Sequence, residues 1–201
     1  AISNLGPLND TVTGQFLPLT EIDLGNTGVL DYDGRKTANF LTPFTNLQRI
    51  NLAGNGIAEI NVLGSFTKLR DLDLSNNALQ DVTPLGSLRK LSRLNLSGNV
   101  SVNGAQLRPL LDQSVNLQSL GLNGIELRDI SALGNLQNPQ TGRAYDLLEL
   151  DLGNTRLAAN GNTGAAWLAG FSGMQRLNLA GNGLLDMRGI EGLTGLKELD
   201  L

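Results

Sequence analysis

The sequence predicts an α/β solenoid, in which short parallel strands stack into one sheet and short return segments close each turn of the coil. Two observations predict this fold. Leucine fills 42 of the 201 positions and asparagine fills 22, and both recur along the whole chain in one pattern that repeats about every 22 residues. One turn of such a repeat cannot bury its own apolar face, so successive turns must stack to form a continuous core.

The repeat is clearest between Leu69 and Leu91, where the sequence reads LxxLxLxxNxLxxVxxLxxLxxL. The same template fits eight units, which are spaced 22 to 30 residues apart. The units begin at Leu19, Leu47, Leu69, Leu91, Leu117, Leu147, Met174 and Leu196. We therefore interpret residues 1–201 as a single solenoid domain.

Each unit is expected to begin with a short strand. The two leucines of the LxL segment lie on one face, because successive side chains of a strand alternate between its faces. Where the chain leaves the strand, an asparagine recurs in four units: Asn55, Asn77, Asn99 and Asn182. An asparagine that turns inward satisfies the backbone groups that the bend buries. Three units have Thr27, Ile125 or Thr155 instead, and we expect weaker side-chain bonding there.

The return segments carry Pro and Gly with apolar residues three apart, as in Val82–Leu88. This spacing favours short 3₁₀ or irregular turns over long helices. The exception is 103–115, where Leu107, Leu110 and Leu111 have helical spacing. We expect a short α-helix there, disturbed by Pro109.

With these motifs the chain resembles leucine-rich repeat proteins over essentially its whole length. The 22-residue units are similar to the subclass found in bacterial internalins and in eukaryotic phosphatase-regulating repeat proteins. The resemblance implies a right-handed, curved solenoid, with the parallel sheet on its concave side and short 3₁₀, irregular or occasionally helical returns on its convex side. It implies little about function, because one fold hosts many functions.

A second, longer period is also present. Residues 19–27 and 147–155 agree at seven of nine positions, and residues 47–56 and 174–183 agree at eight of ten. We interpret this as a duplicated block of about 128 residues, with one copy at 2–129 and a partial copy at 130–201. Neither end of the chain reads as a polar cap, so neighbouring repeats or domains are expected at both open ends.

The strand residues that face solvent form two columns. One reads Glu21, Arg49, Asp71, Arg93, Ser119, Glu149, Arg176, Glu198, and the other reads Asp23, Asn51, Asp73, Asn95, Gly121, Asp151, Asn178, Asp200. Neighbouring strands lie about 4.8 Å apart, so acidic and basic side chains alternate at contact distance. The columns are either a self-neutralised ladder that keeps the sheet soluble or a charged docking surface.

The fifth unit interrupts the charges with Ser119, Gly121 and Asn123, and an insertion at 137–146 follows it. Aromatic side chains on exposed loops are typical interface anchors, so we expect Tyr145 to contact a partner. The residues predicted to bind a partner are Arg49, Asp71, Asp73, Arg93, Asn95, Ser119, Asn123, Tyr145, Glu149, Asp151 and Arg176.

Composition excludes several classes of function. The net charge is −4 and the basic residues are scattered, which disfavours nucleic-acid binding. No stretch approaches the roughly 20 apolar residues of a membrane span. The chain has neither cysteine nor histidine, so disulfides, thiolate nucleophiles, histidine bases and the commonest zinc ligands are missing.

Two pairs of acidic residues, Asp71 with Asp73 and Glu149 with Asp151, have the spacing of glycosidase carboxylates. Both pairs lie in the open beside arginines, and nothing separates the pKa values of their two carboxyl groups. We therefore predict a protein that is not an enzyme and that needs no cofactor or metal.

The preferred hypothesis is recognition of a protein or glycan by a module of a longer secreted or cell-surface protein. The lack of cysteine and the internalin-like units favour an extracellular location. The alternative is a structural stalk or self-associating rod, in which the duplicated blocks join end to end.

Overall fold

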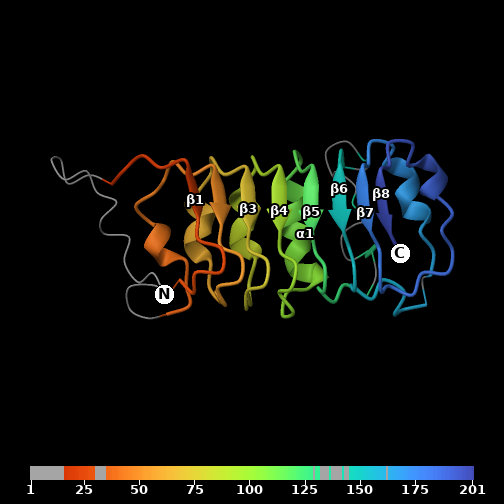
Figure 1. Ribbon diagram of the computed structural model, residues 1–201, viewed down its shortest axis with the longest axis horizontal. Helices are drawn as coiled ribbons and strands as arrows, with labels where there is room; N and C mark the ends of the chain where they lie inside the picture. The colour runs from red at the N-terminus through yellow and green to blue at the C-terminus, as the bar shows by residue number, and fades with distance from the viewer. Residues whose placement is uncertain are drawn as a thin grey trace.

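The computed structural model describes residues 16–29, 35–128, 130–131, 136, 142, 145–161 and 163–201. Within these residues, eight strands form one parallel sheet in chain order (Figure 1). The strands are β1 (Glu21–Asp23), β2 (Arg49–Asn51), β3 (Asp71–Asp73), β4 (Arg93–Asn95), β5 (Ser119–Gly121), β6 (Glu149–Asp151), β7 (Arg176–Asn178) and β8 (Glu198–Asp200). This sheet confirms the predicted α/β solenoid.

The strands pair without a shift in register, so equivalent residues of successive units stand side by side. The middle residue of each strand points inward, as in the column of Ile50, Leu72 and Leu94. These three side chains are at most 3 % exposed. Because each apolar position stacks on its equivalent in the next unit, one continuous core runs through the solenoid.

The return segments form the second layer. They contain the 3₁₀ helices η2 (Asn39–Leu41), η3 (Asn61–Ser65), η4 (Thr83–Ser87), η6 (Ala166–Gly170) and η7 (Ile190–Gly192), and one α-helix, α1 (Gly104–Gln113). Asn103 starts α1 with a capping box that it shares with Gln106. Pro109 lies inside α1 without ending it. The structure thus confirms the predicted 3₁₀ returns and the single helical one.

The predicted inward asparagines form a ladder of hydrogen bonds between units. The Asn77 Nδ2 group donates to the Leu52 carbonyl (3.0 Å) and the Leu74 carbonyl (2.8 Å), one in the preceding unit and one in its own. Its Oδ1 atom accepts from the backbone N–H groups of Asn55 (3.2 Å) and Ile57 (2.9 Å). The four ladder asparagines are at most 8 % exposed, so each one satisfies backbone groups that water cannot reach.

The fifth unit lacks this ladder, as expected from Ile125, which is fully buried. The sixth unit has Thr155 in place of the asparagine, and there a backbone carbonyl takes over the acceptor role. The N–H groups of Leu127 (3.0 Å) and Arg128 (3.1 Å) donate to the carbonyl of Thr155 in the next unit. Arg128 adopts a left-handed backbone, with φ of 64°, at this bend.

Thr155 illustrates the weaker substitute for asparagine. Its hydroxyl donates to the Leu152 carbonyl of its own unit (2.7 Å) and contacts the Oδ1 atom of Asn182 in the following unit (3.0 Å). The shorter side chain does not replace the bond that an asparagine makes to the unit before it.

In the part of the chain that the structure describes, no helix has the length and apolar character to cross a membrane.

Candidate binding surface

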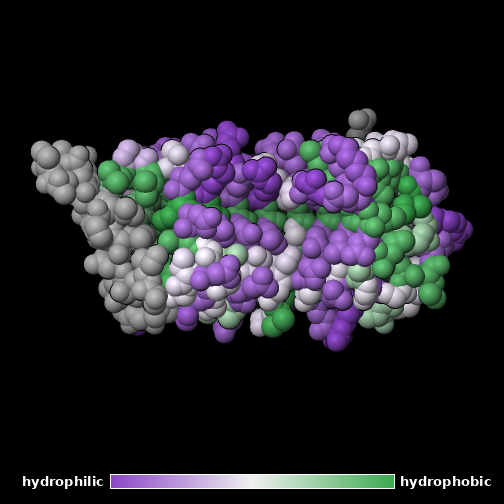
Figure 2. All heavy atoms as spheres, in the orientation of Figure 1, coloured by the Kyte–Doolittle hydropathy of each residue, from purple (hydrophilic) through white to green (hydrophobic). Residues whose placement is uncertain are grey.

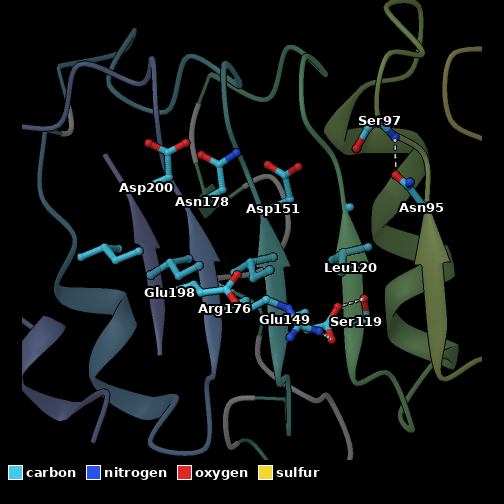
Figure 3. A pocket seen from close by; sticks show the side chains of 14 residues that line it. Asn95, Ser97, Ser119, Leu120, Glu149, Asp151, Arg176, Asn178, Glu198 and Asp200 are labelled. Atoms are coloured by element: carbon cyan, nitrogen blue, oxygen red, sulfur yellow. Dashed lines mark hydrogen bonds and ion pairs between the residues drawn. The ribbon is translucent and has the colours of Figure 1, made fainter. Parts of the chain in front are cut away.

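The outward positions of the eight strands make up one surface, which we call the strand face. In-register pairing arranges them in two rows, one for the first residue of each strand and one for the third. The first row is Glu21, Arg49, Asp71, Arg93, Ser119, Glu149, Arg176 and Glu198. The second row is Asp23, Asn51, Asp73, Asn95, Gly121, Asp151, Asn178 and Asp200. Figure 3 shows part of both rows, which point to the same side of the sheet.

The first row is organised by ion pairs. Arg93 pairs with Asp71 across β3 and β4, at 2.5 Å between Nη2 and Oδ2. Arg49 pairs with Glu21 in the same way, and so does Arg176 with Glu149. Each arginine therefore bonds to the acidic residue of the preceding strand. The arginine side chains remain 49 to 62 % exposed, so these pairs contribute little to stability.

The second row has no basic member, and Asp23, Asp73 and Asp151 are held by uncharged groups. Asp73 Oδ1 accepts from the backbone N–H of Ser75 (2.8 Å), and Asp73 Oδ2 accepts from the side-chain amide of Asn95 (3.3 Å). Asp151 is held in the same manner by the Gly153 N–H (3.0 Å) and the Asn123 amide (3.1 Å). These bonds fix the position of each carboxylate but leave its charge uncompensated by any cation of the row.

The strand face thus accounts for the net negative charge of the protein. Its two rows contain eight carboxylates and three arginines, which give a net charge of −5. The remaining 12 of the 15 basic and 11 of the 19 acidic side chains nearly cancel. One of the two sequence interpretations expected the columns to neutralise themselves. Taken together, the two rows are instead strongly acidic. This excess of acidic residues was already visible in the sequence, because the second column contains four aspartates and no basic residue.

Two hollows lie between the rows, and their floors are the middle residues of the strands. One hollow of about 490 Å³ spans β1 to β4, with Ile50 and Leu72 among its lining residues. Another of about 420 Å³ extends from β4 to β8, with Leu150 and Leu177 on its floor. Figure 2 shows the result, a narrow hydrophobic band that runs along the face between hydrophilic borders. The surface therefore offers a long groove with acidic walls.

Strand β5 interrupts the charges along the groove. Ser119 and Gly121 carry no charge, and the Ser119 hydroxyl donates to Glu149 on β6 (3.2 Å). A side chain at Gly121 would collide with its neighbours, because an added Cβ atom would lie 2.5 Å from Asn95 Oδ1. A larger residue here would therefore force the Asn95 side chain to move.

All the predicted partner-binding residues except Tyr145 lie on the strand face, or directly after β5 in the case of Asn123. Tyr145 was expected to be exposed, and this prediction is wrong. The ring is 4 % exposed and its hydroxyl donates to the Leu111 carbonyl at the end of α1. Burial raises the pKa of Tyr145 to about 12. Tyr145 is a core residue because the chain re-enters the sheet at Leu147, while most of the insertion 137–146 lies outside the described residues.

The two predicted carboxylate pairs, Asp71 with Asp73 and Glu149 with Asp151, both lie on this face. Asp71 and Glu149, one from each pair, are each ion-paired with an arginine. Among the described residues, no group of three or more acidic side chains could hold a metal ion. What the arrangement offers is a row of fixed negative charges above an apolar groove.

Comparison with known proteins identifies the repeats. A family model for leucine-rich repeats (two copies) matches residues 45–85 and 67–104. No curated protein sequence matches the chain significantly. The chain therefore contains leucine-rich repeats, as its sequence pattern predicted.

Solved structures show the same fold. Internalin C2 of Listeria monocytogenes is 23 % identical, with a TM-score of 0.58 over 90 % of this chain and 80 % of that one. TLR13 in complex with ssRNA13 is 21 % identical, with a TM-score of 0.59 over 96 % of this chain and 28 % of that one. The ectodomain of the Arabidopsis thaliana membrane receptor kinase GASSHO1/SCHENGEN3, in complex with CASPARIAN STRIP INTEGRITY FACTOR 2, is 21 % identical, with a TM-score of 0.55 over 86 % of this chain and 21 % of that one. The fold is that of leucine-rich repeat solenoids, internalins among them.

Proposed function

We propose that this leucine-rich repeat solenoid is a non-catalytic recognition module that binds a protein with a basic surface along its strand face. One observation carries the proposal: the net charge of −5 on two rows of fixed side chains, in a chain whose other charges nearly cancel. A field of this kind attracts a cationic partner and orients it before contact. The groove between the rows then provides apolar contact once the partner has docked.

A protein ligand fits this surface better than the other ligand classes. The strand face would repel the phosphates of a nucleic acid, since binding to these depends on cationic side chains. None of its sixteen outward positions is aromatic, so it has no ring on which a sugar could stack. Among the similar structures, the receptor kinase ectodomain was solved with CASPARIAN STRIP INTEGRITY FACTOR 2 and TLR13 with ssRNA13.

The rod alternative is weaker for a reason of charge. If one copy continued the sheet of another in register, β1 would follow β8. This contact would place Glu21 beside Glu198 and Asp23 beside Asp200, with two pairs of like charges at the spacing of neighbouring strands. End-to-end growth in this register is therefore disfavoured.

We further propose that the module acts outside the cell, as part of a longer protein. Support comes from the similar folds of an internalin and a receptor ectodomain and from the absence of cysteine. An antibody against the module should then label intact cells or the surrounding medium, and labelling only after lysis would contradict this location.

The test uses a displayed library of random peptides, panned on the immobilised chain. Enriched peptides should be basic, and their binding should weaken steeply as salt rises. The double variant Asp73→Asn/Asp151→Asn removes two charges of the second row but keeps acceptors for the N–H groups of Ser75 and Gly153. We expect it to lower the affinity at least tenfold.

The matched control is Glu59→Gln/Asp81→Asn, which removes the same charge from exposed positions outside the strands. It should leave binding within about twofold of the unchanged chain. Enrichment of neutral or acidic peptides would contradict the proposal. Equal losses in both double variants would show that overall charge, rather than the strand face, decides binding.

A further inference from the structure

A second charged surface borders the strand face, on the side of the solenoid where the chain enters the strands. We call it the leading side and define it by three positions just before each of the strands β2 to β5. These positions are Thr45, Asn46, Gln48, Thr67, Lys68, Arg70, Arg89, Lys90, Ser92, Val115, Asn116 and Gln118. Four of the twelve residues are basic and none is acidic. The leading side is therefore strongly basic in a chain whose overall charge is −4.

The four basic residues belong to two neighbouring units that stack in register. The pairing of β3 with β4 has an offset of 22 residues, and the same offset places Lys68 beside Lys90, with backbones about 4.8 Å apart. Arg70 lies beside Ser92, whose backbone N–H donates to the Arg70 carbonyl (2.8 Å), and Arg89 directly precedes Lys90. Like charges at this spacing repel one another. An anion between them would relieve the repulsion.

The protein itself does not neutralise this cluster within the described residues. All four basic side chains are exposed, and none of them forms an ion pair there. Lys68 donates to a neutral group, the Oδ1 atom of Asn46 (2.5 Å). The nearest acidic residue in the sequence, Asp71, is already paired with Arg93 on the strand face. The cluster is thus open to an anion from another molecule.

The uncharged residues of the leading side indicate the class of that molecule. Seven of these eight residues carry a hydroxyl or an amide group, and Val115 is the exception. Such groups suit the hydroxyls of a sugar, whereas the centre of a protein interface is rich in apolar and aromatic side chains. None of the twelve residues is aromatic, so the bases of single-stranded nucleic acid have no ring to stack on. A glycan held through acidic groups is bound by ion pairs and needs no such ring.

We propose that the leading side of β3 and β4 binds an anionic glycan through its sulfate or carboxylate groups. Arg70 and Arg89 offer planar guanidinium groups that can bind such a group in a bidentate manner, and Lys68 and Lys90 add point charges. A stiff nucleic-acid duplex fits less well, because it would bring further phosphates close to the acidic strand face. The inference concerns the leading side and does not depend on the ligand of the strand face.

The experiment uses heparin, a sulfated polysaccharide, as the probe. Despite its net negative charge, the unchanged chain should be retained on immobilised heparin at low salt and should elute as the salt concentration rises. The double variant Lys68→Gln/Lys90→Gln removes two charges from exposed positions of the leading side. We expect its affinity for heparin, measured by titration calorimetry, to fall at least tenfold. Its Tm should stay that of the unchanged chain, because exposed side chains add little stability.

The matched control is Arg156→Gln/Arg188→Gln, which removes the same charge from exposed positions outside the leading side. It should leave the affinity for heparin within about twofold of the unchanged chain. Equal losses in both double variants would overturn the proposal, because net charge rather than the leading side would then decide binding. A lack of retention of the unchanged chain at low salt would overturn it as well.

Two further probes separate a glycan from other polyanions. Phosphatidylserine vesicles and a DNA duplex are titrated with the same proteins, and both should bind more weakly than heparin. Tighter binding of either probe, lost in Lys68→Gln/Lys90→Gln, would overturn the assignment to a glycan. Basic peptides selected on the strand face should still bind this variant, so a failure on the leading side would leave the proposed function standing.

Discussion

The units that begin at Leu69 and Leu117 close the same bend with different atoms. In the third unit, the buried side chain of Asn77 bonds to four backbone groups in two successive units. In the fifth unit, Ile125 fills the same place without a polar side-chain atom, and the N–H of Asn99, equivalent to that of Asn55, bonds to the Leu96 carbonyl instead (3.3 Å). The strands on either side nevertheless pair in the same register. Strand pairing and leucine stacking therefore suffice to continue the solenoid, and the ladder adds stability to it.

The largest effect is expected where the ladder is complete. Asn77→Ala removes the only partner of the Asn55 and Ile57 N–H groups, while the carbonyls of Leu52 and Leu74 keep a second asparagine donor each. Buried amides without a partner are costly, and we expect a loss of about 3 kcal/mol in the free energy of unfolding. Urea denaturation measures it.

The matched change in the fifth unit is Ile125→Val, which removes one buried methyl group and no ladder bond. It should cost about 1 kcal/mol. If the two variants were equally destabilised, the asparagine ladder would add no stability beyond that of packing.

Tyr145, in the return segment of the fifth unit, is expected to contribute an intermediate amount to the free energy of unfolding. Tyr145→Phe removes the hydrogen bond to the Leu111 carbonyl and should cost about 1 kcal/mol at neutral pH. The pKa of this phenol is raised from 10.0 to about 12 in the folded chain. Its contribution is therefore complete below pH 10 and is lost as the pH rises toward 12.

The unchanged chain should accordingly lose more stability between pH 10 and pH 12 than the phenylalanine variant loses. Unfolding measured at several pH values in this window gives the difference. Parallel curves for the two proteins would show that Tyr145 ionises as freely in the folded chain as in the unfolded one, and that its burial does not matter to stability.

The smallest effect is expected on the strand face. Arg93→Gln, next to the ladder units, and Arg176→Gln, beyond the fifth unit, each break an exposed ion pair. Both should change the free energy of unfolding by less than about 0.5 kcal/mol, as thermal unfolding would show. A larger loss for Arg93 alone would mean that the outer row and the inner ladder are coupled, which the separate bonding of the two sets does not predict.

Much of the molecule follows from local patterns in the sequence. The position of every strand, the inward course of Asn55, Asn77, Asn99 and Asn182 and the helix after Asn103 were all predicted. Each depends on the spacing of residues within one unit, where the alternation of a strand or the turn of a helix decides which way a side chain points. The duplication of 128 residues remains a prediction.

Other features depend on residues far apart in the chain, and only the tertiary structure decided them. Tyr145 reads as an exposed loop residue, but its ring packs in the core because the end of α1, 34 residues earlier, provides an acceptor. Arg49 and Arg176 were predicted to stand beside acidic residues on both sides, and in the structure each pairs with the acidic residue of the strand before it. The sequence by itself determined the repeating frame, because periodic leucines can be buried only by stacking. Which side chains remain charged, paired or exposed was decided by contacts between units, since a repeat pattern does not specify the reach of each side chain.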